Sequence, residues 1–137
     1  MKVILDTNLW VSFLIGHQTR LVRMILTDLR FDVYVCDQLI AEIRDVTSRQ
    51  KVRKLVTQSE VEDLFAIIHA FCKYATAQAE IASSSVRDPK DLYLLSLAET
   101  IGATYIVSGD ADLTDLIQHK QTQILKLADF KKMMSYS

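Results

Sequence analysis

The feature that most constrains this chain is its opening segment, residues 1–8 (MKVILDTN). The apolar run 3–5 is too short for a helix, so it predicts a buried strand that ends at Asp6. In a parallel sheet covered by helices on both faces, the carboxyl end of such a strand opens into the crevice where open α/β sheets bind ligands. The sequence therefore predicts a functional site at the end of this first strand.

Composition limits the class of protein. Half of the 137 residues are hydrophobic, enough for one core, so we expect a single domain over 1–137. A net charge of −1 means that a nucleic-acid partner must be held by a local patch or by metal. Cys36 and Cys72 form no ligand cluster, which disfavours zinc. The opening is not a signal peptide and no apolar segment reaches membrane-spanning length, so we expect a soluble, cytoplasmic protein.

Hydrophobic periodicity alternates between the helical and the extended pattern along the chain. We expect helices over 9–15, 18–29, 38–49, 60–74, 89–101, 113–118 and 128–134, and strands over 3–5, 31–35, 104–107 and 123–127. The stretch 75–85 is expected to be a loop with a short extended piece. This alternation predicts a three-layer α/β/α fold around a mainly parallel sheet of four to five strands, joined by right-handed crossovers.

Polar residues mark the expected helix ends. Asp37 is a good N-cap, and Ser59 with Glu62 forms a capping box at the start of a later helix. Residues 88–89 (Asp-Pro) suit the N-cap and first position of the helix that follows them. Gly102 suits the C-terminal cap of that same helix.

Two acidic residues fall on helix faces that we expect to point inward. Glu42 lies within the apolar stripe that contains Leu39 and Val46. Burying an unpaired carboxylate is costly, so Glu42 either marks the rim of the stripe or meets a cation. Asp91 shares a helix face with Leu95, and it either stabilises the helix dipole or belongs to a site.

Four carboxylates from separated places are candidates for one crevice, since Asp110 ends the strand 104–107 as Asp6 ends the first; the others are Glu42 and Asp91. Clustered like charges repel, and a hard divalent cation resolves the conflict. Oxygen-only ligands indicate Mg²⁺ or Mn²⁺. Such a cation can bind a phosphate oxygen and activate water, which is the chemistry of phosphodiester hydrolysis. No catalytic triad, P-loop or GxGxxG supports a competing chemistry.

In their order and spacing these motifs resemble the PIN domain family, over almost the whole chain. The segments that carry the resemblance are VILDTN (3–8), Glu42 on the helix after the second strand, RDPKD (87–91) and YIVSGDAD (105–112). Ser108 stands where the family more often has Thr. The chain is most similar to the VapC-like toxins of bacterial and archaeal toxin–antitoxin pairs.

The resemblance implies a metal-dependent endoribonuclease that hydrolyses RNA phosphodiester bonds as the toxin of such a pair. Asp6 and Asp91 would be the main Mg²⁺ or Mn²⁺ ligands. Glu42 and Asp110 would complete the acidic set directly or through water, and either Asp110 or Asp112 would face the metal. It also implies an antitoxin on a separate chain and a homodimer.

Polar and basic side chains surround the acids in this interpretation. Thr7, Asn8 and Ser108 would support the metal ligands by hydrogen bonds. An acidic site needs positive charge at its margin to admit a polyanion, although such a basic run can also be a merely solvated surface. The basic residues available to hold the RNA backbone are Arg44, Arg49, Lys51, Arg53, Lys54, Arg87 and Lys90.

Three other functions stay open at this point. The chain can be a structure-specific or DNA-directed PIN nuclease, or a non-catalytic PIN module that binds RNA or protein. A phosphotransfer enzyme or phosphatase can also use an Asp after its first strand as a nucleophile. That class often has a second Asp two residues later, where this chain has Asn8.

Overall fold

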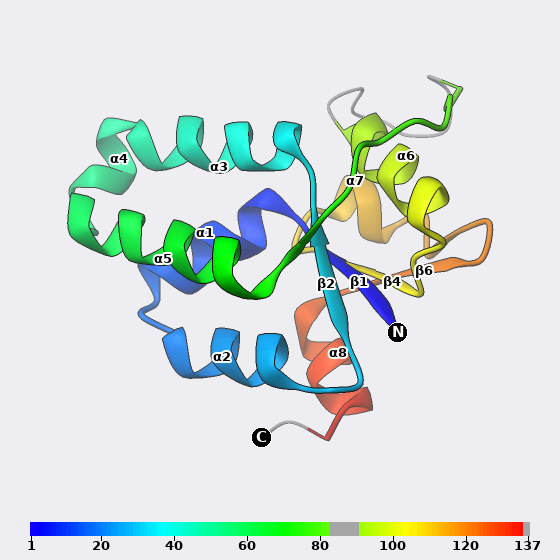
Figure 1. Cartoon of the computed structure of the whole chain (residues 1–137), viewed down its shortest axis with the longest axis horizontal. Helices are drawn as coiled ribbons and strands as arrows, with labels where there is room; N and C mark the ends of the chain where they lie inside the picture. The colour runs from blue at the N-terminus through cyan, green and yellow to red at the C-terminus, as the bar shows by residue number, and fades with distance from the viewer. Residues whose placement is uncertain (83–90, 136–137) are drawn as a thin grey trace.

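The computed structural model describes residues 1–82 and 91–135 (Figure 1). Its strands are β1 (Lys2–Leu5), β2 (Asp32–Val35), β3 (Lys73–Tyr74), β4 (Tyr105–Val107), β5 (Gln118–His119) and β6 (Thr122–Leu125). They form one sheet in the order β3-β2-β1-β4-β6-β5. Every neighbouring pair is parallel except the antiparallel pair β5 and β6. The predicted mainly parallel α/β sheet is confirmed.

The helices are α1 (Thr7–Ile15), α2 (Thr19–Thr27), α3 (Asp37–Ser48), α4 (Gln50–Arg53), α5 (Gln58–Phe71), α6 (Leu92–Ile101), α7 (Ala111–Thr114) and α8 (Leu127–Met133). Figure 1 shows α1 to α5 gathered on one side of the sheet and α6 and α7 on the other. The sheet is thus the middle of three layers. In the described ranges, no helix is both long enough and apolar enough to span a membrane.

β1 is a central strand of this sheet. Val3, Ile4 and Leu5 are fully buried, as the apolar run predicts. Ile4 pairs with Tyr34 of β2 on one side and with Ile106 of β4 on the other. From β1 the chain crosses to β2 in one direction, and from β4 it crosses to β6 in the other. The strand order therefore reverses between β1 and β4, which is where open α/β sheets form their ligand crevice.

The sheet has six strands rather than the four to five expected. The difference comes from β3 and β5, which have only two residues each and were not predicted. β3 adds to β2 where the helix pattern predicted helix as far as residue 74, and α5 instead ends at Phe71. β5 pairs with β6 where the pattern predicted the end of a helix over 113–118. A two-residue strand has no alternation to detect, so the sequence gives no signal for it.

Two of the predicted N-terminal helix caps are wrong. Cys36, not Asp37, stands at the N-cap of α3, and Asp37 is the first residue of the helix. The capping box of α5 is formed by Thr57 and Glu60, two residues before the predicted pair at 59 and 62. The two possible boxes overlap in the sequence. Gly102 is confirmed as the cap of α6, with a φ of +68°. The predicted cap at 88–89 lies outside the described residues.

Candidate functional site

A polar cleft of about 490 Å³ opens at the carboxyl ends of the central strands. Its walls come from α1, α3, α6 and the turn after β4. The residues that line it are Asp6, Thr7, Asn8, Glu42, Asp45, Val46, Arg49, Asp91, Leu94 and Asp110. The four carboxylates singled out from the sequence therefore face one space, although they come from four separated parts of the chain.

Asp6 is the most buried of these acids, with 4% of its surface exposed. It is the N-cap of α1, and its Oδ1 accepts a hydrogen bond from the Leu9 backbone N–H at 2.9 Å. Its Oδ2 accepts a hydrogen bond from the Ser108 hydroxyl. Burial raises the pKa of Asp6 to about 6, against the opposing effect of these two bonds, and the charges of Asp110 and Glu42 add to the rise.

Ser108 joins the two strand ends that carry acids. Its hydroxyl oxygen donates to Asp6 and accepts from the Asp110 backbone N–H at 2.9 Å. Asp110 in turn is the N-cap of α7, where its Oδ1 accepts from the Asp112 N–H at 2.9 Å. Asp110 lines the cleft, whereas Asp112 lies in the first turn of α7 and is not among the lining residues.

Glu42 is half-buried at the rim of the apolar stripe of α3, since Leu39 beside it is fully buried. Its Oε2 accepts a hydrogen bond from the Thr7 hydroxyl at 2.8 Å and one from the Tyr93 hydroxyl at 2.7 Å. Glu42 therefore lies at the rim of the stripe. The same side chain also reaches the cleft.

Asp91 stands at the N-terminal end of α6, one residue before the helix begins. It is half-buried, and its side chain makes no capping hydrogen bond to the helix backbone. The helix therefore starts without using this carboxylate as a cap, and the carboxylate lines the cleft instead.

The predicted basic residues are placed unequally. Arg49 lines the cleft, where its guanidinium pairs with Asp45 at 2.9 Å. Arg44 instead lies over the Phe65 ring, 4.0 Å from its centroid, and pairs with Glu62 at 3.6 Å. Three more are exposed and do not line the cleft; these are Lys51, Arg53 and Lys54. Arg87 and Lys90 lie outside the described residues.

Two polar residues of the site were not predicted from the sequence: Asp45, which lines the cleft, and Tyr93, whose hydroxyl donates to Glu42. Asp45 lies three positions after Glu42 and four before Arg49, and this helical spacing could have placed all three on one face. Tyr93 carries no such signal, because it sits in an apolar segment that reads as core. Its ring is core and its hydroxyl is polar, and only the three-dimensional packing shows which carboxylate the hydroxyl reaches.

The donor set of the cleft suits a hard divalent cation. Within residues 1–82 and 91–135, no three His, Cys, Asp or Glu side chains form a ready-made metal-binding group. Mg²⁺ does not need such a cage, because it keeps several waters and binds through one or two carboxylates. The negative charges that raise the pKa of Asp6 would be relieved by a bound cation, so these residues fit it.

Comparison with known proteins agrees with this geometry. A family model described as "PIN domain" matches residues 2–112. The chain belongs to the PIN domain family. The match spans the four carboxylates singled out from the sequence and confirms the resemblance seen there. PIN domains are generally metal-dependent nucleases, so membership supports hydrolase activity on nucleic acid.

A solved structure shares the fold. A chain of VapBC2 from Rickettsia felis, bound to a DNA fragment from their promoter, is similar to this PIN domain with a TM-score of 0.57 at 12% identity. The alignment covers 92% of this chain and 98% of that one. At this identity the likeness shows the fold alone. No curated protein sequence matches the chain significantly.

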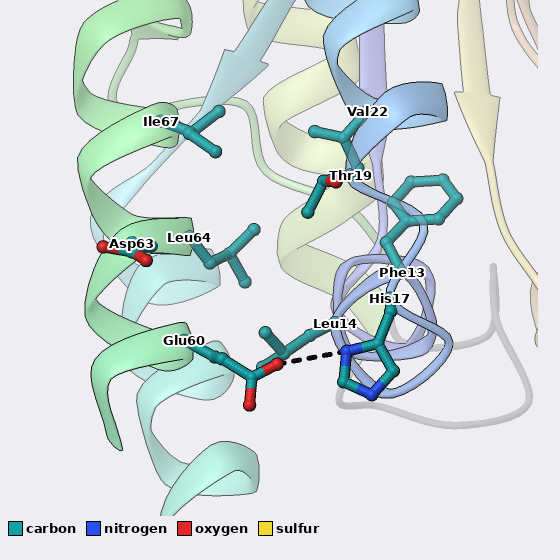
Figure 2. A pocket seen from close by; sticks show the side chains of 9 residues that line it. All are labelled: Phe13, Leu14, His17, Thr19, Val22, Glu60, Asp63, Leu64 and Ile67. Atoms are coloured by element: carbon teal, nitrogen blue, oxygen red, sulfur yellow. Dashed lines mark ion pairs between the residues drawn. The ribbon is translucent and has the colours of Figure 1, made fainter. Parts of the chain in front are cut away.

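A second hollow, of about 90 Å³, lies between α5 and the α1–α2 pair (Figure 2). We call it the apolar groove; its lining residues are Phe13, Leu14, His17, Thr19, Val22, Glu60, Asp63, Leu64 and Ile67. At its rim the His17 Nδ1 and Glu60 Oε2 atoms are 3.1 Å apart, as the dashed line in Figure 2 marks. This hollow contains none of the residues predicted for the site.

Proposed function

We propose that this PIN domain is a divalent-metal-dependent endoribonuclease that hydrolyses RNA phosphodiester bonds in the acidic cleft. The observation that carries the proposal is the convergence of Asp6, Glu42, Asp91 and Asp110 on one cleft where the strand order reverses. Membership of the PIN domain family supports it.

In this proposal Asp6 and Asp91 are the main ligands of Mg²⁺ or Mn²⁺, and Glu42 and Asp110 complete the acidic set directly or through water. When bound, the cation supplies Lewis acidity, a more acidic water and charge stabilisation for the in-line displacement. The protein supplies the orientation of the ligands. Ser108 holds Asp6 beside the backbone of Asp110, and the cap of α1 holds the other oxygen of Asp6.

The remaining residues of the site have supporting roles. Thr7 donates to Glu42, and the Asp112 N–H fixes the side chain of Asp110. Asn8 is exposed on the cleft wall, where it can hydrogen-bond a water or a ribose hydroxyl. Together they keep the carboxylates in place while RNA and water exchange.

Arg49 is the basic residue best placed to contact the RNA backbone, because its guanidinium is exposed at the cleft. Its ion pair with Asp45 is exposed on both sides, and such pairs contribute only about 0–1 kcal/mol. A phosphate can therefore compete with Asp45 for the guanidinium. The other predicted basic residues on the described chain would contact RNA only beyond the cleft.

The test is a cleavage assay on matched RNA and DNA strands of one sequence, with Mn²⁺ and with EDTA. We expect RNA cleavage that requires Mn²⁺ and is lost in Asp91→Asn. The control is Asp63→Asn, since that acid lies at the apolar groove and not in the cleft. Undiminished activity in EDTA, or a fully active Asp91→Asn protein, would contradict the proposal. Preferred cleavage of DNA would support a DNA-directed PIN nuclease, and tight RNA binding without turnover would support a non-catalytic module.

We also propose that the nuclease is the toxin of a pair, acting on cytoplasmic RNA as a homodimer and silenced by an antitoxin on a separate chain. The sequence resemblance to VapC-like toxins and the fold shared with a VapBC2 chain support this assignment. Expression of the chain alone should arrest growth, and expression of Asp91→Asn should not. Normal growth with active protein present would argue against a toxin.

A further inference from the structure

One hydrogen-bond cluster in the cleft wall joins three helices. Glu42 comes from α3, Thr7 from the start of α1 and Tyr93 from the first turn of α6. The Thr7 hydroxyl lies 2.8 Å and the Tyr93 hydroxyl 2.7 Å from the same atom, Oε2 of Glu42. The two hydroxyls are 3.5 Å from each other. A single carboxylate oxygen therefore receives both donors.

In this arrangement the two carboxylate oxygens of Glu42 have different environments. A carboxylate oxygen has two lone-pair sites, and the two hydroxyls use both sites of Oε2. In the described part of the chain, Oε1 accepts no hydrogen bond. A carboxylate held in this way cannot chelate a cation through both oxygens. It can offer one oxygen, Oε1, to the cleft.

Tyr93 is suited to hold that geometry. Only 8% of its surface is exposed, so its ring is fixed by packing and its hydroxyl cannot wander. Thr7 is equally buried, and it follows Asp6 directly in the chain. The position of Glu42 is thus tied to the same turn that positions the most buried acid of the cleft.

We propose that Tyr93 is a positioning residue of the nuclease site: with Thr7 it engages Oε2 of Glu42, so that Glu42 meets the divalent cation, or a water of its shell, through Oε1 alone. This inference rests on the proposed function. Groups that orient a metal ligand typically change metal affinity or activity by about 10- to 100-fold when they are removed. If the Tyr93 hydroxyl only connects α6 to α3, its removal would change the stability of the protein and leave its metal affinity unchanged.

The test removes the Tyr93 hydroxyl and measures metal binding without RNA. We expect Tyr93→Phe to bind Mn²⁺ about tenfold more weakly than wild type in calorimetry while its circular-dichroism spectrum is retained. The control is Tyr105→Phe, because that hydroxyl contacts the Met133 sulfur at 3.5 Å, outside the cleft. Its Mn²⁺ affinity should equal that of wild type.

A double-mutant cycle identifies the atom through which Tyr93 acts. In a Glu42→Gln background, Tyr93→Phe should produce no further loss of Mn²⁺ affinity. Thr7→Val, which removes the other donor at nearly constant shape, should weaken Mn²⁺ binding, and Thr7→Ser should restore it. These Thr7 variants decide the question if Tyr93→Phe fails to fold.

The outcomes separate this inference from the proposed function. Wild-type Mn²⁺ affinity in a folded Tyr93→Phe protein, or in Thr7→Val if Tyr93→Phe does not fold, would overturn the inference and leave the nuclease proposal standing. If the wild-type protein neither binds Mn²⁺ nor cuts RNA, the proposed function fails. In that case crystal structures of metal-free wild type and Tyr93→Phe decide the inference: an unmoved Glu42 carboxylate overturns it, and a displaced one supports the positioning role.

Discussion

The acidic cleft and the apolar groove both hold carboxylates, and they treat them in opposite ways. Glu60 at the groove is half-buried, and the Thr57 backbone N–H, more than the nearby His17, lowers its pKa. Asp6 in the cleft is buried beside other acids, and its pKa is raised to about 6. The Glu60 carboxylate at the groove stabilises the start of α5. The Asp6 carboxylate in the cleft is instead destabilised by its burial. A charge kept under such conditions is typical of a functional site.

The largest expected difference between the two regions is in catalysis. Asp6→Asn should lower RNA cleavage by at least about 100-fold, because it removes a charged ligand of the proposed metal site while keeping the cap of α1. Glu60→Gln should leave the rate within about twofold. Initial rates at saturating Mn²⁺ measure both. Equal losses in the two variants would remove the distinction between the regions.

The next largest effect concerns stability and pH. The pKa of Asp6 is raised from 3.8 to about 6, so the folded protein binds more protons than the unfolded one between these values. Stability without metal should therefore fall as pH rises through that window, by up to about 3 kcal/mol. Asp6→Asn abolishes this loss, so the variant should be more stable than wild type at pH 8 and similar to it at pH 4.

Urea unfolding in EDTA at both pH values measures this effect. Added Mn²⁺ should stabilise the wild-type protein at pH 8 more than the variant, since in the proposed site the cation binds the charged carboxylate of Asp6. A variant that is less stable than wild type at pH 8 without metal would show that the buried charge is not held at a cost.

A smaller effect is expected at the rim of the cleft. Arg49→Ala should weaken RNA binding and reduce the slope of log affinity against log salt by about one, as for the loss of one phosphate contact. Asp45→Asn should strengthen RNA binding about two- to fivefold, because it releases Arg49 and removes a negative charge. Arg44→Ala should matter less than Arg49→Ala, since Arg44 lies over Phe65. Titrations with the Asp91→Asn background at several salt concentrations test this ranking.

The smallest effect is expected for the ion pair at the groove. Glu60→Gln keeps a residue that can complete the capping box of α5 and loses only the pairing with His17. The melting temperature should change by no more than about 1–2 °C. A large decrease in melting temperature would show that the ion pair between Glu60 and His17 is important for stability.

The sequence predicted best what depends on burial. The run 3–5 could only be a buried strand, and the acids at 6 and 110 follow strands that proved to be neighbours, so their meeting could be inferred from topology. Glu42 was harder, because a carboxylate in an apolar stripe has two physical explanations. Tyr93 could not be found, since the hydroxyl of a core tyrosine reveals its partner only when three helices are packed together.

The errors in predicting the fold have a similar origin. Thr57 and Ser59 both begin a possible capping box, since each stands three residues before a Glu, and α5 uses the first. β3 and β5 exist because a neighbouring strand offers them hydrogen bonds, not because of their own residues. Local sequence cannot supply such long-range information.

The position of β1 between β2 and β4 also governs when the cleft can exist during synthesis. Asp6 receives its hydrogen bond from Ser108, which is 102 residues further along the chain. A nascent chain synthesised only as far as α3 contains Asp6 and Glu42. It still lacks β4 and the turn after it, which carries Ser108 and Asp110. In the proposed nuclease the acidic set is therefore complete only after β4 and the turn that follows it have been synthesised, so we expect a shorter nascent chain to be inactive.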